Sequence, residues 1–137
     1  FRAKVRVSQA PYLRHCFWMV PEKILPELDV FNYSGENPRK MEFGSYMGNP
    51  KDKNNLNVKR SHVKGPNFSK RYYIFTLDWK PGQLTWKING MTVSKFKTNI
   101  PDEPMYMIMN SGLDEEIDNS KMPREMHIDW VEAFKER

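Results

Sequence analysis

The sequence predicts an all-β protein, an antiparallel sandwich, and three observations carry this prediction. Residues 1–8, FRAKVRVS, alternate apolar and polar side chains, which is typical of a strand with one buried face. Ten Pro and seven Gly residues are spread along the chain and suit frequent turns. Asn89-Gly90 lies between two β-type runs and is the strongest hairpin signal in the chain. Several strands at short intervals indicate two packed antiparallel sheets.

The expected strands follow in order, and each is marked by its own residues. FWMV and ELDVFNY are separated by a loop with two prolines, and MEFGSYM alternates along its length. RYYIFTLDW is rich in aromatic and branched side chains, and a Pro-Gly turn separates it from LTWKI. We expect strands at residues 1–8, 17–20, 27–33, 41–47, 71–79, 84–88, 91–98, 104–112 and 126–135. Residues 114–125 are acidic and polar and are expected to form a loop.

Length and composition indicate a single domain over residues 1–137. The lone Cys16 excludes an internal disulfide framework. No run approaches the roughly 18 apolar residues of a membrane helix, and no signal-peptide core is present, so no membrane partner is expected. His62 and His127 have no ligand spacing around them, which argues against a transition-metal site.

A basic segment lies in the middle of the chain, which has a net charge of +5. Its cations are Lys51, Lys53, Lys59, Arg60 and Lys64. Such a cluster is either a patch for an anionic polymer or a solvated, mobile loop. Aromatic residues are scarce in this segment, so a base-stacking platform is not supported and no nucleic-acid partner is expected.

Two carboxylates stand inside the apolar run ILPELDVFNYSG, residues 24–35, where burial of a charge is costly without a partner or a role. Glu27 and Asp29 are two residues apart and therefore share one face of a strand. Asn32, three residues beyond Asp29, would face the other way in a regular strand. A β-bulge adds one residue and would bring position 32 onto the same face.

The stretch ELDVFN resembles the Glu-x-Asp-x-x-Glu signature of glycoside hydrolase family 16, which includes laminarinases, lichenases, agarases and carrageenases. FRAKVRVS with FWMV, RYYIFTLDWKPGQLTWKINGMTV, NIPDEPMYMIMN and HIDWVEAF are similar to flanking strands of that family, in the same order. The resemblance implies a concanavalin A-like jelly roll whose concave sheet binds sugar. It also implies that the N-terminal strands of the domain are missing and that residues 1–137 are its later part.

Carried over residue by residue, the resemblance makes Glu27 the nucleophile and Asp29 the residue that orients it. Asn32 falls where the family has its general acid/base Glu, and an amide has no proton to give. The implied function is retaining hydrolysis of O-glycosidic bonds in a β-linked polysaccharide, a β-glucan or a galactan, impaired at Asn32. The alternative is a non-catalytic carbohydrate-binding module that uses the same cleft. Glu42 is either a substitute acid near the nucleophile or a plain polar contact.

Candidate sugar-binding residues come from strands expected around this cleft. They are Tyr33, Tyr46, Trp79, Trp86 and Asn110. For Trp79 and Trp86 the competing interpretation is core packing, and for Tyr33 and Asn110 it is a structural role.

The remaining expectations also follow from the resemblance. Asp129 matches an aspartate that helps hold a structural Ca²⁺ in many relatives, and no other cofactor is expected. The expected location is extracellular or periplasmic, and the expected partner is polysaccharide. Missing strands would leave sheet edges that favour self-association.

Overall fold

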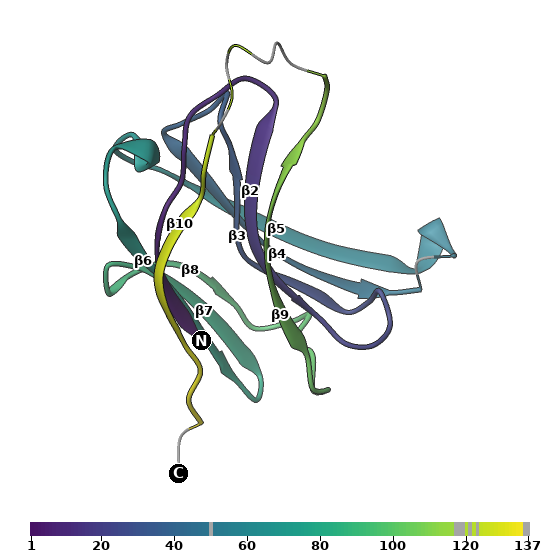
Figure 1. The fold of residues 1–137 in the computed structure, drawn as a ribbon. Coiled ribbons are helices and arrows are strands. Elements are labelled where there is room, and N and C mark those ends of the chain that lie inside the picture. The colour runs from purple at the N-terminus through teal and green to yellow at the C-terminus, as the bar shows by residue number, and fades with distance from the viewer. Residues whose placement is uncertain (50, 117–119, 121, 123, 136–137) are drawn as a thin grey trace.

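The computed structural model describes residues 1–135 apart from residues 50, 117–119, 121 and 123. It is a sandwich of two antiparallel five-stranded sheets, as Figure 1 shows, and the predicted fold class is confirmed. The regular helical elements in this part of the chain are the short turns Lys53–Asn55 and Phe68–Lys70. Among the described residues, no helix has the length and apolar character needed to cross a membrane.

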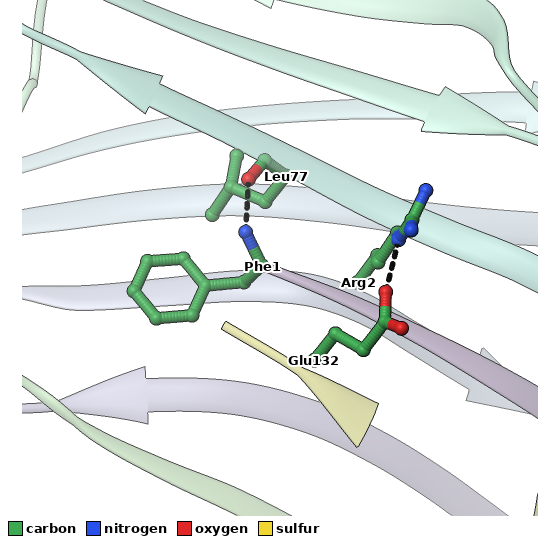
Figure 2. A network of polar contacts seen from close by, with 4 residues as sticks. All are labelled: Phe1, Arg2, Leu77 and Glu132. Atoms are coloured by element: carbon green, nitrogen blue, oxygen red, sulfur yellow. Dashed lines mark hydrogen bonds and ion pairs between the residues drawn. The ribbon is translucent and has the colours of Figure 1, made fainter. Parts of the chain in front are cut away.

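The first sheet has the order β10-β1-β6-β7-β8. Its strands are β1 (Arg2–Arg6), β6 (Tyr73–Lys80), β7 (Gln83–Ile88), β8 (Met91–Phe96) and β10 (His127–Glu132). The Phe1 ammonium donates to the Leu77 carbonyl at 3.0 Å, and the Arg2 side chain pairs with Glu132 at 2.5 Å (Figure 2). Strand β1 is thereby joined to β6 on one side and to β10 on the other.

The second sheet has the order β5-β4-β3-β2-β9 and carries the carboxylate strand at its centre. Its strands are β2 (Leu13–Val20), β3 (Glu27–Ser34), β4 (Lys40–Gly48), β5 (Leu56–Lys64) and β9 (Tyr106–Leu113). Side chains along β2 alternate between the core and the outward face, whereas in β3 this alternation is interrupted by a register shift. Glu27 and the β3 side chains that share its face therefore belong to the outward face of this sheet.

The core lies between the sheets and is rich in aromatic residues. Its largest fully buried side chains are Trp86, Tyr33, Phe17, Phe31, Phe43, Phe68, Phe75, Met19, Leu28, Met41, Leu77 and Leu84. The Phe31 and Phe75 ring centroids are 4.5 Å apart, and those of Trp86 and Phe96 are 4.7 Å apart. The Trp86 indole N–H donates to the Asp29 carbonyl at 2.8 Å, so a first-sheet side chain is bonded to the backbone of β3.

His15 is a fully buried polar residue whose ring nitrogens both have partners. Its Nε2 lies 3.0 Å from the Ser8 hydroxyl, and its Nδ1 lies 2.6 Å from the Ser111 hydroxyl. Burial lowers the pKa of His15 to about 4, because the charged imidazolium would lose its hydration. The ring is therefore neutral at pH 7.

The structure corrects the expected loop over the basic segment. Residues 56–64 form β5, which pairs along its whole length with β4. Leu56 lies opposite Gly48 at one end, and Lys64 lies opposite Lys40 at the other. The strand lies at the edge of the sheet, so neither of its faces needs to be apolar and its sequence lacks a hydrophobic signal. Strand β2 also begins at Leu13, earlier than expected, because buried His15 takes a core position there. Part of the expected loop at 114–125 lies outside the described residues.

Candidate functional site

The predicted bulge in the carboxylate strand is present. Asp29 pairs with Gly44 and Asn32 pairs with Glu42, so three steps on β3 match two steps on β4. The same irregularity separates the pairs that β3 makes with β2. Asn32 is thereby turned to the face of Asp29, and both residues line one outward pocket of about 310 Å³.

Strand register places two rows of side chains across this face. Asp29 lies between Gly44 on β4 and Trp18 on β2. Asn32 lies between Glu42 on β4 and Cys16 on β2. Asp29 and Asn32, which sequence spacing set on one strand, are therefore flanked on this face by residues of β2 and β4.

Asp29 is held by a chain of two hydrogen bonds that runs toward the edge of the sheet. The Tyr46 hydroxyl donates to Asp29 Oδ2 at 3.2 Å, and Arg60 Nε donates to the Tyr46 hydroxyl at 3.1 Å. The Arg60 guanidinium also lies 5.2 Å from the centre of the Tyr46 ring. Gly44 makes room for that ring, since a Cβ on Gly44 would lie 2.6 Å from Tyr46 Cε2.

The Glu27–Asp29 pair shares a proton. Asp29 is 4% exposed, and burial together with the nearby Glu27 charge raises its pKa to about 7. Burial also raises the pKa of Glu27, while the hydrogen bond from Asp29 opposes that rise. Asp29 consequently keeps its proton at mildly acidic pH and donates it to the Glu27 carboxylate. Such a pair presents one oriented anion on the sheet surface.

Asn32 is held by a hydrogen bond from Arg14, which is itself in an ion pair with Asp114. Arg14 Nη1 donates to Asn32 Oδ1 at 3.2 Å. Arg14 Nε donates in turn to the Asp114 carboxylate at 2.8 Å. The bonds join strand β2, the bulge in β3 and the segment that follows β9.

Glu42 lines the same pocket as Asp29 and Asn32. One of its oxygens pairs with Lys40 Nζ at 2.6 Å, and its side chain is 43% exposed. Arg14, Asn32 and Glu42 also line a neighbouring pocket of about 210 Å³. Position 32 therefore lies where two pockets on the same face meet.

The expected sugar-binding residues divide between the two faces of the sheets. Tyr46 lines the outward pocket, and Asn110 accepts from the Trp18 indole at 2.8 Å beside it. The assignments of Trp86 and Tyr33 are wrong, because both side chains are fully buried in the core. The bulge explains Tyr33, since the turn that brings Asn32 outward sends its successor inward.

The expectation for Trp79 is also wrong, because this residue lies on β6 in the first sheet. Its indole donates to the Pro101 carbonyl at 2.8 Å, and its ring packs near Phe1 with centroids 6.2 Å apart. It is thus part of the packing at one end of the sandwich.

Three site residues were missed from the sequence. Trp18 was detectable, because alternation in FWMV sets it opposite the core residue Phe17. Arg60 was not placed in the site because the segment around it was expected to form a loop and not strand β5. Arg14 contacts Asp114 across 100 residues of chain, and no local pattern signals such a contact.

The expected calcium ligand does not fit a metal site. The Asp129 carboxylate pairs with Lys4 Nζ at 2.6 Å on the first sheet. An ammonium group thus takes the place that a cation would need. Among the described residues, no group of three or more His, Cys, Asp or Glu side chains is arranged to hold a metal ion.

Comparison with known proteins places this geometry in context. A family model described as glycosyl hydrolases family 16 matches residues 1–132. Glucan endo-1,3-beta-glucosidase A1 of Niallia circulans is 24% identical over 164 residues, covering 100% of this chain and 24% of the relative. A beta-glucanase of Paenibacillus macerans is 27% identical over 115 residues, covering 77% of this chain and 44% of the relative. The chain thus spans less than half the length of these curated relatives.

Solved structures agree with the fold. A Bacteroides ovatus protein of a mixed-linkage glucan locus, solved with its G4G4G3G product, superposes with a TM-score of 0.78 at 17% identity. The superposition covers 96% of this chain and 67% of that one.

Proposed function

Because the chain belongs to glycosyl hydrolases family 16, we propose that the outward face of its second sheet binds a β-linked polysaccharide, with Glu27 as the retained nucleophile. The observation that carries the proposal is the proton-sharing pair of Glu27 and Asp29 beside a bulge that turns Asn32 to the same face. The preferred substrate class is β-glucan, in line with the names of the relatives; galactan is the other class.

In the proposed retaining reaction, a Glu27 oxygen attacks the anomeric carbon and the bond from that carbon to the leaving oxygen breaks. Asp29 holds Glu27 in place through the shared proton. The leaving oxygen needs a proton that Asn32 lacks, and general acid assistance contributes about 10²–10⁴-fold per step. Polysaccharide cleavage by this site is therefore slow or absent.

Glu42 is the proposed substitute acid. It lies across from Asn32 in the strand register and lines both pockets at position 32. Lys40 pairs with one of its oxygens. The competing role is a plain polar contact that closes one wall of the site.

The second candidate function is polysaccharide binding without turnover. It is favoured by the contact from Arg14 to Asn32, which gives position 32 a defined partner in the absence of a carboxylate. The site would then hold sugar through its amides, its tyrosine and Trp18.

An activated substrate separates the two functions. A 2,4-dinitrophenyl β-glucan oligosaccharide needs no proton on its leaving group, so we expect a burst of phenolate as Glu27 becomes glycosylated. Added azide should then attack the anomeric carbon, release Glu27 and give a β-glycosyl azide. Glu27→Gln is the matched control and should show no burst. Binding of β-glucan without any burst or azide product would establish the binding module instead.

Native polysaccharide tests Glu42. If the unmodified chain hydrolyses soluble β-glucan and Glu42→Gln abolishes this activity, while the azide reaction persists, Glu42 supplies the proton. Loss of neither activity would leave Glu42 as a wall residue.

We also propose that the protein self-associates through its edge strands and acts outside the cytoplasm, in an extracellular or periplasmic space. Strands β9 and β10 each end a sheet and expose apolar side chains. Met107 is 42% exposed, Leu113 47% and Ile128 43%. Open edges with apolar side chains favour pairing with another chain. Sedimentation over a concentration series tests self-association, and a single monomeric species at all concentrations would exclude it.

A further inference from the structure

Arg14 settles the orientation of the Asn32 amide. A guanidinium has only donors, so the amide atom that faces Arg14 at 3.2 Å must be the carbonyl oxygen. The amide NH₂ is then directed away from Arg14, on a side chain that lines both outward pockets. In the described part of the chain, this NH₂ group donates to no protein acceptor.

Arg14 is itself fixed. Its Nε is bound by the Asp114 carboxylate at 2.8 Å, which leaves Nη1 directed at Asn32. Because two planar groups hold the guanidinium from different sides, the amide cannot flip without losing the bond from Arg14. Position 32 thus carries two N–H groups of known direction at the junction of the two pockets.

We propose that Arg14 is a positioning residue that makes position 32 a fixed hydrogen-bond donor toward an oxygen of the bound polysaccharide. The same guanidinium would hold a carboxyl introduced at position 32 in its ionised form. The proposal deepens the polysaccharide-binding function and rests on it. It implies that Asn32→Glu alone does not restore a general acid.

The charged groups around position 32 bear on whether the pKa of an introduced carboxyl would be lowered. Arg14 approaches from β2, and Cys16 on that strand is kept as a thiol because burial raises its pKa to about 11. From β4, the Glu42 carboxylate is offset by its ion pair with Lys40. On β3 itself, Glu27 and Asp29 share a proton and together carry one negative charge. Arg60, from β5, is bound to the Tyr46 hydroxyl, and Asp114 is paired with Arg14 itself. The Arg14 guanidinium is the charged group bonded to position 32, and an adjacent cation lowers a carboxyl pKa by about 1–3.

The first test measures that pKa directly. Asn32→Glu would be compared with the double variant Asn32→Glu, Arg14→Met by ¹³C NMR titration of the introduced carboxyl. We expect the pKa to be lower by about 1 when Arg14 is present, at the small end of the range because Arg14 is partly solvated. Equal pKa values in the two variants would overturn the proposal.

Arg2→Met is the matched control for the first test. Arg2 is also an arginine paired with a carboxylate, Glu132 (Figure 2), but it lies on β1 in the first sheet. Combined with Asn32→Glu, it should leave the titration of the introduced carboxyl unchanged. A shift as large as that caused by Arg14→Met would point to a general effect of lost positive charge and would overturn the assignment.

The second test measures binding of soluble β-glucan by calorimetry to the chain with Asn32 in place. Arg14→Met should weaken binding by about fivefold, because the donor loses its fixed direction. Arg14→Lys still donates only, and should recover part of the affinity. Equal binding by the Met variant, with an unchanged melting temperature, would overturn the donor role. If the unmodified chain binds no polysaccharide, the proposed function fails, and the titration still decides what Arg14 does.

Discussion

Replacing Asp29 with Asn should stabilise the folded protein at neutral and alkaline pH. Asp29 is almost completely buried, and burial raises its pKa from about 3.8 in the unfolded chain to about 7 in the fold. The fold therefore binds a proton that the unfolded chain releases, so stability is full below pH 3.8 and declines as pH rises toward 7. Asparagine has nearly the same shape, carries no charge, and can still accept from Tyr46 and donate to Glu27.

The magnitude follows from the two pKa values. They differ by about 3, and each unit corresponds to about 1.4 kcal/mol, which gives an upper limit of about 4 kcal/mol above pH 7. Because Glu27 titrates together with Asp29, we expect about 2 kcal/mol for Asp29→Asn at pH 8, and little change at pH 3.

Urea unfolding at pH 3, 5 and 8 measures this difference. Asp78→Asn, which removes a partly exposed carboxylate paired with Lys87 on the first sheet, is the control and should show no such rise with pH. The reasoning is refuted if Asp29→Asn is no more stable than the parent at pH 8, or if its advantage is the same at all three values.

Three further predictions concern the frame of the site. Gly44→Ala should displace the Tyr46 ring, remove the hydroxyl donor from Asp29 and raise the Asp29 pKa further, which ¹³C NMR would detect; an unchanged titration would contradict this. In an Asp29→Asn background, stability should fall by up to about 3 kcal/mol as pH drops from 6.5 to 4, because buried His15 stays neutral while the unfolded chain gains a proton. His15→Gln should reduce this dependence of stability on pH. If the dependence persists, it arises from a group other than His15. Trp86→Phe should cost about 1–3 kcal/mol in urea unfolding, because the buried Asp29 carbonyl loses its donor, and a near-neutral result would show that it finds another.

Sequence patterns were sufficient for those parts of the fold that have a buried face. Alternation located β1 and β4, and the Asn89-Gly90 turn placed β7 and β8 side by side. Spacing alone sets Asn32 opposite Asp29 in a regular strand, and the bulge that would bring it to the same face is present in the register. By contrast, β5 has no strong pattern because it is an edge strand whose side chains are exposed or only half-buried.

The site was predictable to the extent that it lies within one strand. Glu27, Asp29 and Asn32 all come from β3, so strand spacing together with a bulge puts them on one face. The contacts of Asn32 with Arg14, and of Asp29 with Tyr46, depend on how strands pair and could not be derived from local spacing. Trp86 was wrongly assigned to sugar binding. An aromatic residue in a strand can stack on sugar or fill the core, and which role it has depends on the face of the sheet to which it points.

The bond from Trp86 to the Asp29 carbonyl means that the backbone of the site is held by the core, independently of the side chains that carry its chemistry. The bulge is held from the interior by the Trp86 indole, which bonds to a backbone atom and not to a side chain. Side chains above it can therefore be exchanged one at a time while their spacing persists. An acid can give way to an amide and leave the neighbouring carboxylates where they were. The backbone geometry of the site is thus set by the core, and the outward side chains determine only its chemistry.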